Sequence, residues 1–128
     1  MKTLYASEIR EINWEEILAQ ILEEQKASPK DILFIQSLVK QFLEHAEKID
    51  ELIKEKLEHW DFKRLNSVDR IILRIGVCEM LFFPDIPIKV SIDEAIELAK
   101  KFSSADAGKF VNGILDAIAK SNKEILAK

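Results

Sequence analysis

The sequence predicts an all-α protein of six to seven helices, and three observations support this prediction. Apolar residues recur at helical spacing over most of the 128 residues. Glycine and proline, which interrupt helices, occur only three times each, so long helices with few turns are expected. Asparagine or serine, the residue types that favour helix starts, precedes several of the apolar runs. A chain of this length supports one domain, or two small subdomains that share a core.

The first half of the chain is expected to begin with a short helix over residues 2–9. Asn13 then has the position of an N-cap for a second helix. Ser28 is the predicted N-cap of a third helix, with Pro29 at the favoured first helical position. The apolar pattern that follows is long for one straight helix, so we expect a bend or a break near residues 48–50.

The most apolar helix of the chain is predicted to run from Ser67 to Phe82, after a connection at residues 60–62. Asn66 stands directly before it as a predicted N-cap. Its apolar residues occur on nearly all sides, which is typical of a buried helix, so we interpret it as the central core helix. Cys78, the single cysteine, is then most simply a small core residue.

Two more helices are expected after this core helix. Ser91 and Glu94 have the spacing of a capping box, which predicts a helix from Ser91 through Phe102. Ser103 or Ser104 is expected to begin the last helix. No internal repeat or flexible linker interrupts this plan.

The sequence gives little support for catalysis, a metal or a cofactor. Neither His45 nor His59 belongs to a metal-ligand pattern, and no glycine-rich phosphate loop is present. No nucleophile has a base beside it, so we expect no catalytic residues and a protein that is not an enzyme. No apolar run is long enough to span a membrane and no signal-peptide pattern occurs, so a cytoplasmic location is expected. The formal charge of −4 argues mildly against indiscriminate nucleic-acid binding and still allows a local basic face.

Asn112 and Gly113 are unusual residues for the apolar pattern of the last helix. An interior glycine costs a helix roughly 1 kcal/mol relative to alanine. An amide among apolar neighbours needs a hydrogen-bond partner. Either close packing between helices or a surface reserved for a partner would explain these residues.

Polar side chains of the last helix form a candidate binding face. Lys109, Asn112 and Asp116 are spaced i, i+3 and i+7, so they share one side of the helix. A lysine beside an amide can hold a phosphate and a base edge of single-stranded RNA. Lys101 extends this candidate set, and Phe110 is either a core residue or a stacking platform for a base. An ordinary solvated surface of mixed charge is the alternative.

Several separate motifs, in the correct order, resemble the NusB family of transcription antitermination factors. The resemblance is strongest from about Ile49 to the C-terminus. It rests on residues 64–70 (RLNSVDR), Leu73-Arg74, residues 79–81 (EML) and residues 93–116 (DEAIELAKKFSSADAGKFVNGILD). It implies one NusB-like domain over residues 1–128, with two small helical bundles that share a core.

The resemblance also implies partners and site residues. NusB-like proteins bind a single-stranded RNA element, boxA, together with the ribosomal protein NusE, and so act indirectly on elongating RNA polymerase, notably on ribosomal RNA operons. Tyr5 and Glu79 match the NusE-binding surface, and Arg74 is placed with them. Arg74 has a structural alternative, an ion pair with a carboxylate of a neighbouring helix. The RNA-binding set is predicted to consist of Lys2, Lys101, Lys109, Phe110, Asn112 and Asp116, of which Asp116 would moderate the affinity because it repels phosphate.

One departure from the family concerns the start of the chain. Family members usually begin with an arginine-rich segment that contacts boxA, whereas this chain begins with residues 1–5 (MKTLY). Either the true start lies upstream, or this form has lost the main electrostatic contact. In the second case we expect weaker RNA binding, and a tendency to form a homodimer through uncovered apolar surface. Two other functions stay open, an RNA-binding module of an RNA methyltransferase and a self-associating helical scaffold without RNA binding.

Overall fold

A computed structural model describes residues 29–57, 62, 65–123 and 126 of the chain. The chain divides into two compact units, residues 1–46 and residues 47–128. The two predicted opening helices and the Asn13 cap lie outside the described residues. The bundle organisation of the whole chain therefore stays a prediction from the family resemblance.

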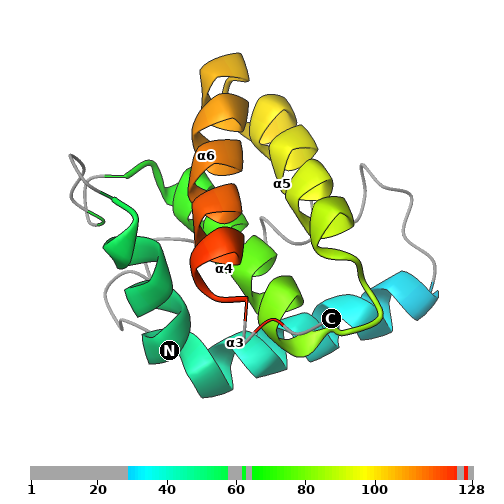
Figure 1. Ribbon diagram of the computed structural model, residues 1–128. Coiled ribbons are helices and arrows are strands. Elements are labelled where there is room, and N and C mark those ends of the chain that lie inside the picture. Colours follow the sequence, from blue (N-terminus) through cyan, green and yellow to red (C-terminus); the bar gives the residue numbers. More distant parts are fainter. Residues whose placement is uncertain (1–28, 58–61, 63–64, 124–125, 127–128) are drawn as a thin grey trace. The chain divides into compact units, whose positions relative to one another are not determined.

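The described residues form four α-helices and contain no strand, so the all-α prediction is confirmed (Figure 1). In chain order they are α3 (Pro29–Glu55), α4 (Ser67–Phe82), α5 (Ile88–Phe102) and α6 (Ala105–Ser121). None of the helices in this part of the chain is both long and apolar enough to cross a membrane.

Helix α3 begins at Pro29, the position that the sequence predicts, and it contains a kink. The backbone at His45 leaves the helical region, with φ −128° and ψ 23°. The predicted bend near residues 48–50 is therefore real but lies closer to the N-terminus. The Nδ1 atom of His45 lies 3.0 Å from the backbone oxygen of Gln41, within the last turn before the kink.

Helix α4 has the predicted bounds and the predicted burial. The side-chain oxygen of Asn66 accepts a hydrogen bond from the backbone N–H of Val68 at 2.7 Å, which confirms Asn66 as the N-cap. Ten of the sixteen residues of the helix are buried, as expected for a central core helix. Cys78 is fully buried, and this burial raises the pKa of its thiol to about 12.

Helices α5 and α6 pack against each other and against α4, and Figure 1 shows them side by side in front of α4. Ser104 caps α6, because its hydroxyl accepts a hydrogen bond from the backbone N–H of Ala107 at 3.1 Å. The predicted cap at Ser91 is wrong, since α5 begins at Ile88 and Ser91 is a buried residue inside it. The N-cap is Pro87, whose carbonyl accepts the backbone N–H of Ser91 at 3.1 Å.

Close packing of α4 on α6 depends on Gly76. A Cβ atom at this position would lie 2.8 Å from Cδ1 of Leu115, which is too short for a carbon–carbon contact. Leu115 is fully buried, so its side chain has little room to move away. Glycine at this position therefore avoids a clash with the buried side chain of Leu115, which would otherwise have to move.

We predict that Gly76→Ala lowers the free energy of unfolding by about 1–3 kcal/mol, because the added methyl group overpacks the contact with Leu115. Urea unfolding measures this loss. The variant Leu115→Ala leaves a cavity that the new methyl group can partly fill. The double variant should therefore lose less stability than the sum of the single variants, and additive losses would contradict the contact.

Candidate nucleic-acid interface

The α5–α6 pair presents its polar side chains from two helices that approach closely near their connection. At Gly108, a Cβ atom would lie 3.0 Å from Cγ of Lys100 and 3.4 Å from Cγ2 of Ile96. The aliphatic part of Lys100 thus lies against the backbone of α6. This contact brings the end of α5 that carries Lys101 alongside the part of α6 that carries Lys109.

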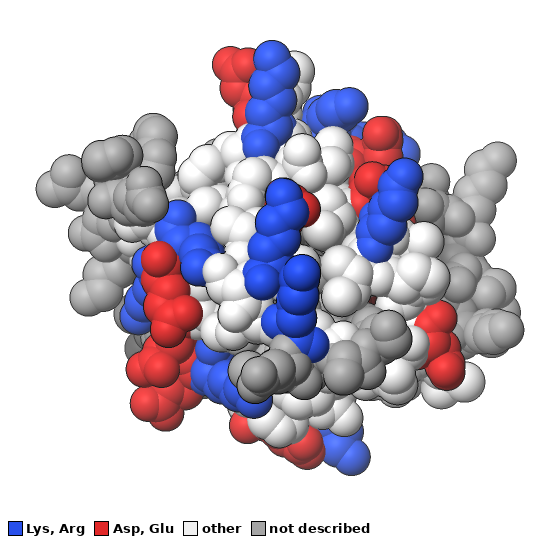
Figure 2. Space-filling view, in the orientation of Figure 1, with Lys and Arg blue, Asp and Glu red and all other residues white. Residues whose placement is uncertain are grey.

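The predicted RNA-binding residues of α6 lie largely on the surface. Lys109 and Asn112 are exposed, Asp116 is partly exposed, and Lys101 on α5 is exposed. Phe110 is half-buried, so both of its predicted roles, core packing and base stacking, stay compatible with its position. Figure 2 shows lysine side chains over the face formed by α5 and α6, with acidic side chains among them. The geometry gives this face the exposure that RNA binding requires, while the individual roles stay predictions.

Asp116 has a partner within its own helix. One of its carboxylate oxygens lies 2.9 Å from Nζ of Lys120, in an exposed pair at i, i+4 spacing. Pairing with a cation reduces the field that a carboxylate projects toward a phosphate. The pair therefore weakens the repulsion of phosphate on which the moderating role of Asp116 depends, and that role stays a prediction.

Gly113 differs from the other two glycines. Among the residues that the structure describes, a Cβ atom built on Gly113 would meet nothing within 4 Å, and the residue is exposed. Of the two explanations left open by the sequence, close helix packing does not apply to Gly113. Asn112 is exposed too, so its amide does not face an apolar interior.

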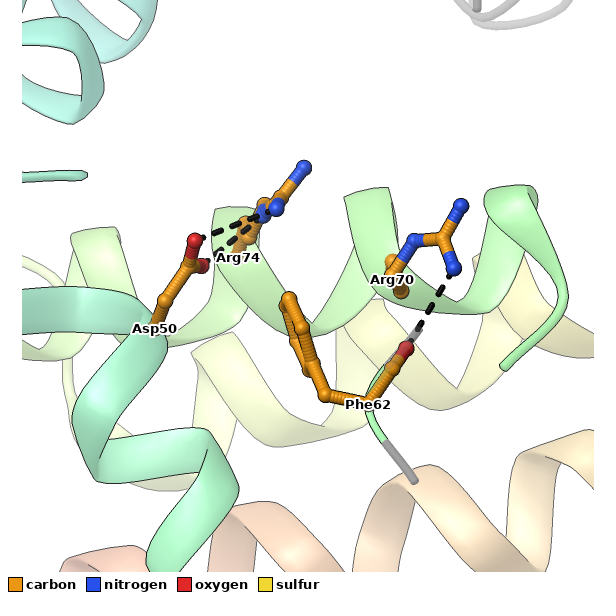
Figure 3. A network of polar contacts seen from close by, with 4 residues as sticks. All are labelled: Asp50, Phe62, Arg70 and Arg74. Atoms are coloured by element: carbon orange, nitrogen blue, oxygen red, sulfur yellow. Dashed lines mark hydrogen bonds and ion pairs between the residues drawn. The ribbon is translucent and has the colours of Figure 1, made fainter. Parts of the chain in front are cut away.

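Arg74 is fully buried and holds Asp50 in a two-point ion pair (Figure 3). Its Nε donates to Oδ1 of Asp50 at 2.9 Å, and its second terminal nitrogen donates to Oδ2 at 3.1 Å. The guanidinium also lies over the ring of Phe62, 5.2 Å from the centroid. Burial raises the pKa of Asp50, while the hydrogen bond and the charge of Arg74 oppose this rise. The structural role proposed for Arg74 fits this geometry, whereas a direct partner contact requires exposure that the side chain lacks.

Arg70, one turn before Arg74, holds the segment that precedes α4. One of its terminal nitrogens donates to the backbone oxygens of Leu65 at 2.9 Å and Phe62 at 3.3 Å. The other donates to the hydroxyl of Ser67 at 3.3 Å. Both arginines of α4 therefore act inside unit 2, and neither is presented as a contact surface.

Three predicted site residues remain. Glu79 of the NusE-binding set is buried, whereas Tyr5 of that set and Lys2 of the RNA-binding set lie outside the described residues. Glu79 is only 6% exposed. This burial does not favour the predicted direct contact with a protein partner, because the carboxylate faces the interior. Tyr5 and Lys2 both precede the first residue that the structure describes, so their predicted roles stay predictions.

The sequence interpretation missed Asp50 and Phe62, the two residues that contact the buried guanidinium of Arg74. Asp50 stands between Ile49 and the further apolar positions of α3, and an acidic residue within such a pattern signals a buried charge that needs a cation. Phe62 was assigned only to a connection.

Within the described residues, no group of three or more histidine, cysteine or acidic side chains could hold a metal ion.

These features define a small helical protein, in which the buried helix α4 supports α6, an amphipathic helix whose polar side faces outward. The chain belongs to the NusB family, whose model matches residues 1–120. The transcription antitermination protein NusB of a Nitratiruptor species is 44% identical over 120 residues, which cover 94% of this chain and 86% of that protein. The transcription antitermination protein NusB of Bacillus subtilis (strain 168) is 41% identical over 118 residues, covering 92% and 87%.

Two solved structures are similar as well. NusB of T. maritima has a TM-score of 0.72 and 45% sequence identity, covering 85% of this chain and 80% of that one. A chain in the crystal structure of a plectonemic RNA supercoil has a TM-score of 0.74 and 34% identity, covering 92% of this chain and 86% of its own. Sequence and structure therefore place the chain in the same family.

We predict that Asp50→Ala lowers the free energy of unfolding by about 3–5 kcal/mol, because it leaves the charge of Arg74 buried without its carboxylate. Adding Arg74→Met to this variant removes the unpaired charge and should restore part of the loss. Urea unfolding of the single and double variants measures both effects. Asp116→Ala is the matched control, since its exposed pair with Lys120 should be worth less than about 1 kcal/mol. A loss at Asp50 no larger than this control would contradict the structural role of the buried pair.

Proposed function

We propose that this chain is a transcription antitermination factor that binds boxA RNA together with the ribosomal protein NusE. Its family membership and its relatives, which are named transcription antitermination protein NusB, support this proposal. The chain would thereby help RNA polymerase to continue elongation, notably on ribosomal RNA operons. It would do so in the cytoplasm, through binding and without a catalytic step.

The observation that carries the RNA half of the proposal is the outward-facing polar side of α6. Lys109 and Asn112 are exposed there at i, i+3 spacing. The ammonium group of Lys109 suits a phosphate, and the amide of Asn112 can donate to and accept from a base edge. The half-buried ring of Phe110 offers an edge on which an unstacked base can rest. A similar chain occurs in the crystal structure of a plectonemic RNA supercoil, which supports RNA binding in general.

The NusE half of the proposal rests on the family. Arg74 is fully buried, so in this proposal it acts by fixing α4 through Asp50 and not by direct contact. The predicted role of Glu79, which is 6% exposed, rests on the family resemblance. Two modest interfaces, one with RNA and one with NusE, would reinforce each other if each ligand favours the same arrangement of the protein. NusE should then tighten RNA binding by the same factor by which RNA tightens NusE binding.

Titration of the full chain with a fluorescent boxA oligonucleotide, with and without purified NusE, tests this function. We expect saturable binding that NusE strengthens, and weaker binding to a scrambled RNA of equal length. Absence of boxA binding under both conditions would contradict the proposal and favour a helical scaffold. Concentration-dependent sedimentation in the same buffer would identify self-association.

We predict that Lys109→Ala weakens boxA binding by up to about tenfold, because a phosphate contact is lost. The slope of log affinity against log salt concentration should flatten by about 0.7, the value for one phosphate on a single strand. Fluorescence anisotropy at several salt concentrations measures both quantities. Lys89→Ala is the control. It also removes one positive charge, but Lys89 lies at the start of α5, whereas Lys101 and the contact with α6 lie at its end. Equal effects of the two substitutions would show that only net charge matters.

A further inference from the structure

The three glycines of the chain have two different explanations. Gly76 and Gly108 are positions where helices pack closely, with neighbouring side-chain atoms 2.8 Å and 3.0 Å from a built Cβ. Gly113 lies in the middle of α6, where a built Cβ would meet no atom of another described segment within 4 Å. The described part of the chain therefore gains no packing from the missing side chain at Gly113.

A glycine in this position weakens the helix that contains it. Its backbone is helical, so alanine would fit the same conformation and would reduce the entropy lost on folding. The weakness is placed near the centre of α6, away from both ends, where a glycine could otherwise help the chain to turn. The described part of the fold does not offset this loss of helix stability, so we look for a ligand that binds the outer surface of α6.

The residues around Gly113 indicate the chemical class of this ligand. Gly113 follows Lys109 by four residues and Phe110 by three, so both lie one turn earlier on adjoining parts of the same side. Asn112 is the preceding residue and is exposed. Gly113 thus lies beside a cation, an aromatic ring and an amide, which are groups that hold phosphate, base face and base edge.

We propose that Gly113 is a specificity-determining residue, at which a nucleotide of single-stranded RNA lies directly against the backbone of α6. This inference rests on the function proposed above and deepens it. With no side chain at Gly113, a nucleotide whose phosphate is held by Lys109 can bring its base or ribose down to Phe110 and Asn112. A methyl group at this position would keep the nucleotide from lying directly against the backbone of α6.

Charge favours RNA over a protein segment as the occupant. Lys109 is exposed on α6, and Lys101 is exposed at the end of α5 that lies alongside. Figure 2 shows basic side chains on the face of these two helices with acidic ones among them. The contact between Lys100 and Gly108 brings the lysines at the end of α5 close to Lys109, so the cations gather there. A polyanion matches this face better than an apolar helix, for which the exposed Lys109 and Asn112 would be poor neighbours.

The variant Gly113→Ala tests the inference, because it predicts opposite signs for stability and binding. The melting temperature should rise by a few degrees, since alanine is the better helix former. The affinity for a synthetic single-stranded boxA RNA should fall by about tenfold, and further for Gly113→Leu, which adds more bulk. Gly76→Ala is the matched control, since the same substitution at a packing site should lower the melting temperature.

Each alternative gives a different result. A raised melting temperature with unchanged RNA affinity would overturn the inference alone, and the proposed function would stand. A lowered melting temperature would show that another segment of this chain covers Gly113, which also overturns it. Loss of NusE binding, measured without RNA while RNA affinity is unchanged, would assign the position to the protein partner. Failure of the unmodified chain to bind boxA RNA would overturn both this inference and the proposed function.

Discussion

The burial of α4 on almost all sides is the constraint from which the rest of unit 2 follows. A helix in this position can keep polar side chains only where the protein supplies their partners. Arg74 meets this requirement through Asp50, which ties the second part of α3 to α4. Arg70 meets it through the carbonyls of Phe62 and Leu65, which fixes the segment that leads into the helix.

This constraint separates two sets of polar residues that look alike in the sequence. The arginines of α4 are used for internal contacts, as Figure 3 shows for Arg70 and Arg74. On α6, by contrast, Val111 and Leu115 are buried while Lys109 and Asn112 are exposed. A face that is rigidly supported from behind can present polar groups with little conformational freedom left to lose on binding. The division explains how one small helical unit can be both stable and available to a ligand.

Apolar spacing and capping residues predicted those helix bounds that depend on neighbouring residues in the sequence. The bounds of α4 follow from an all-round apolar pattern with Asn66 before it, and the start of α6 follows from Ser104. The predicted cap at Ser91 failed because Pro87 can begin the helix without a side-chain acceptor, which leaves Ser91 to be buried by tertiary packing. The bend in α3 was displaced for a similar reason, since periodicity detects a helix that is too long and does not locate the residue that breaks it.

The candidate site was predictable on α6 and less so on α4. Spacing alone places Lys109, Asn112 and Asp116 on one side of a helix, and the apolar residues between them turn that side outward. Spacing cannot distinguish an outward carboxylate from an inward one on a helix that is apolar all round, so the predicted partner role of Glu79 rests on the family resemblance alone and stays a prediction. Asp50 was missed because the partner of Arg74 lies 24 residues away in the chain, beyond the reach of any local pattern.

The most direct test of the RNA-binding face is a titration of the isotopically labelled chain with single-stranded boxA RNA, followed by NMR. The account predicts that the amide signals around Lys109, Asn112 and Gly113 shift, with those near Lys101, while the signals of the α4 interior, such as Leu73 and Val77, stay in place. Shifts confined to residues away from α5 and α6, with the α6 signals unchanged, would contradict it.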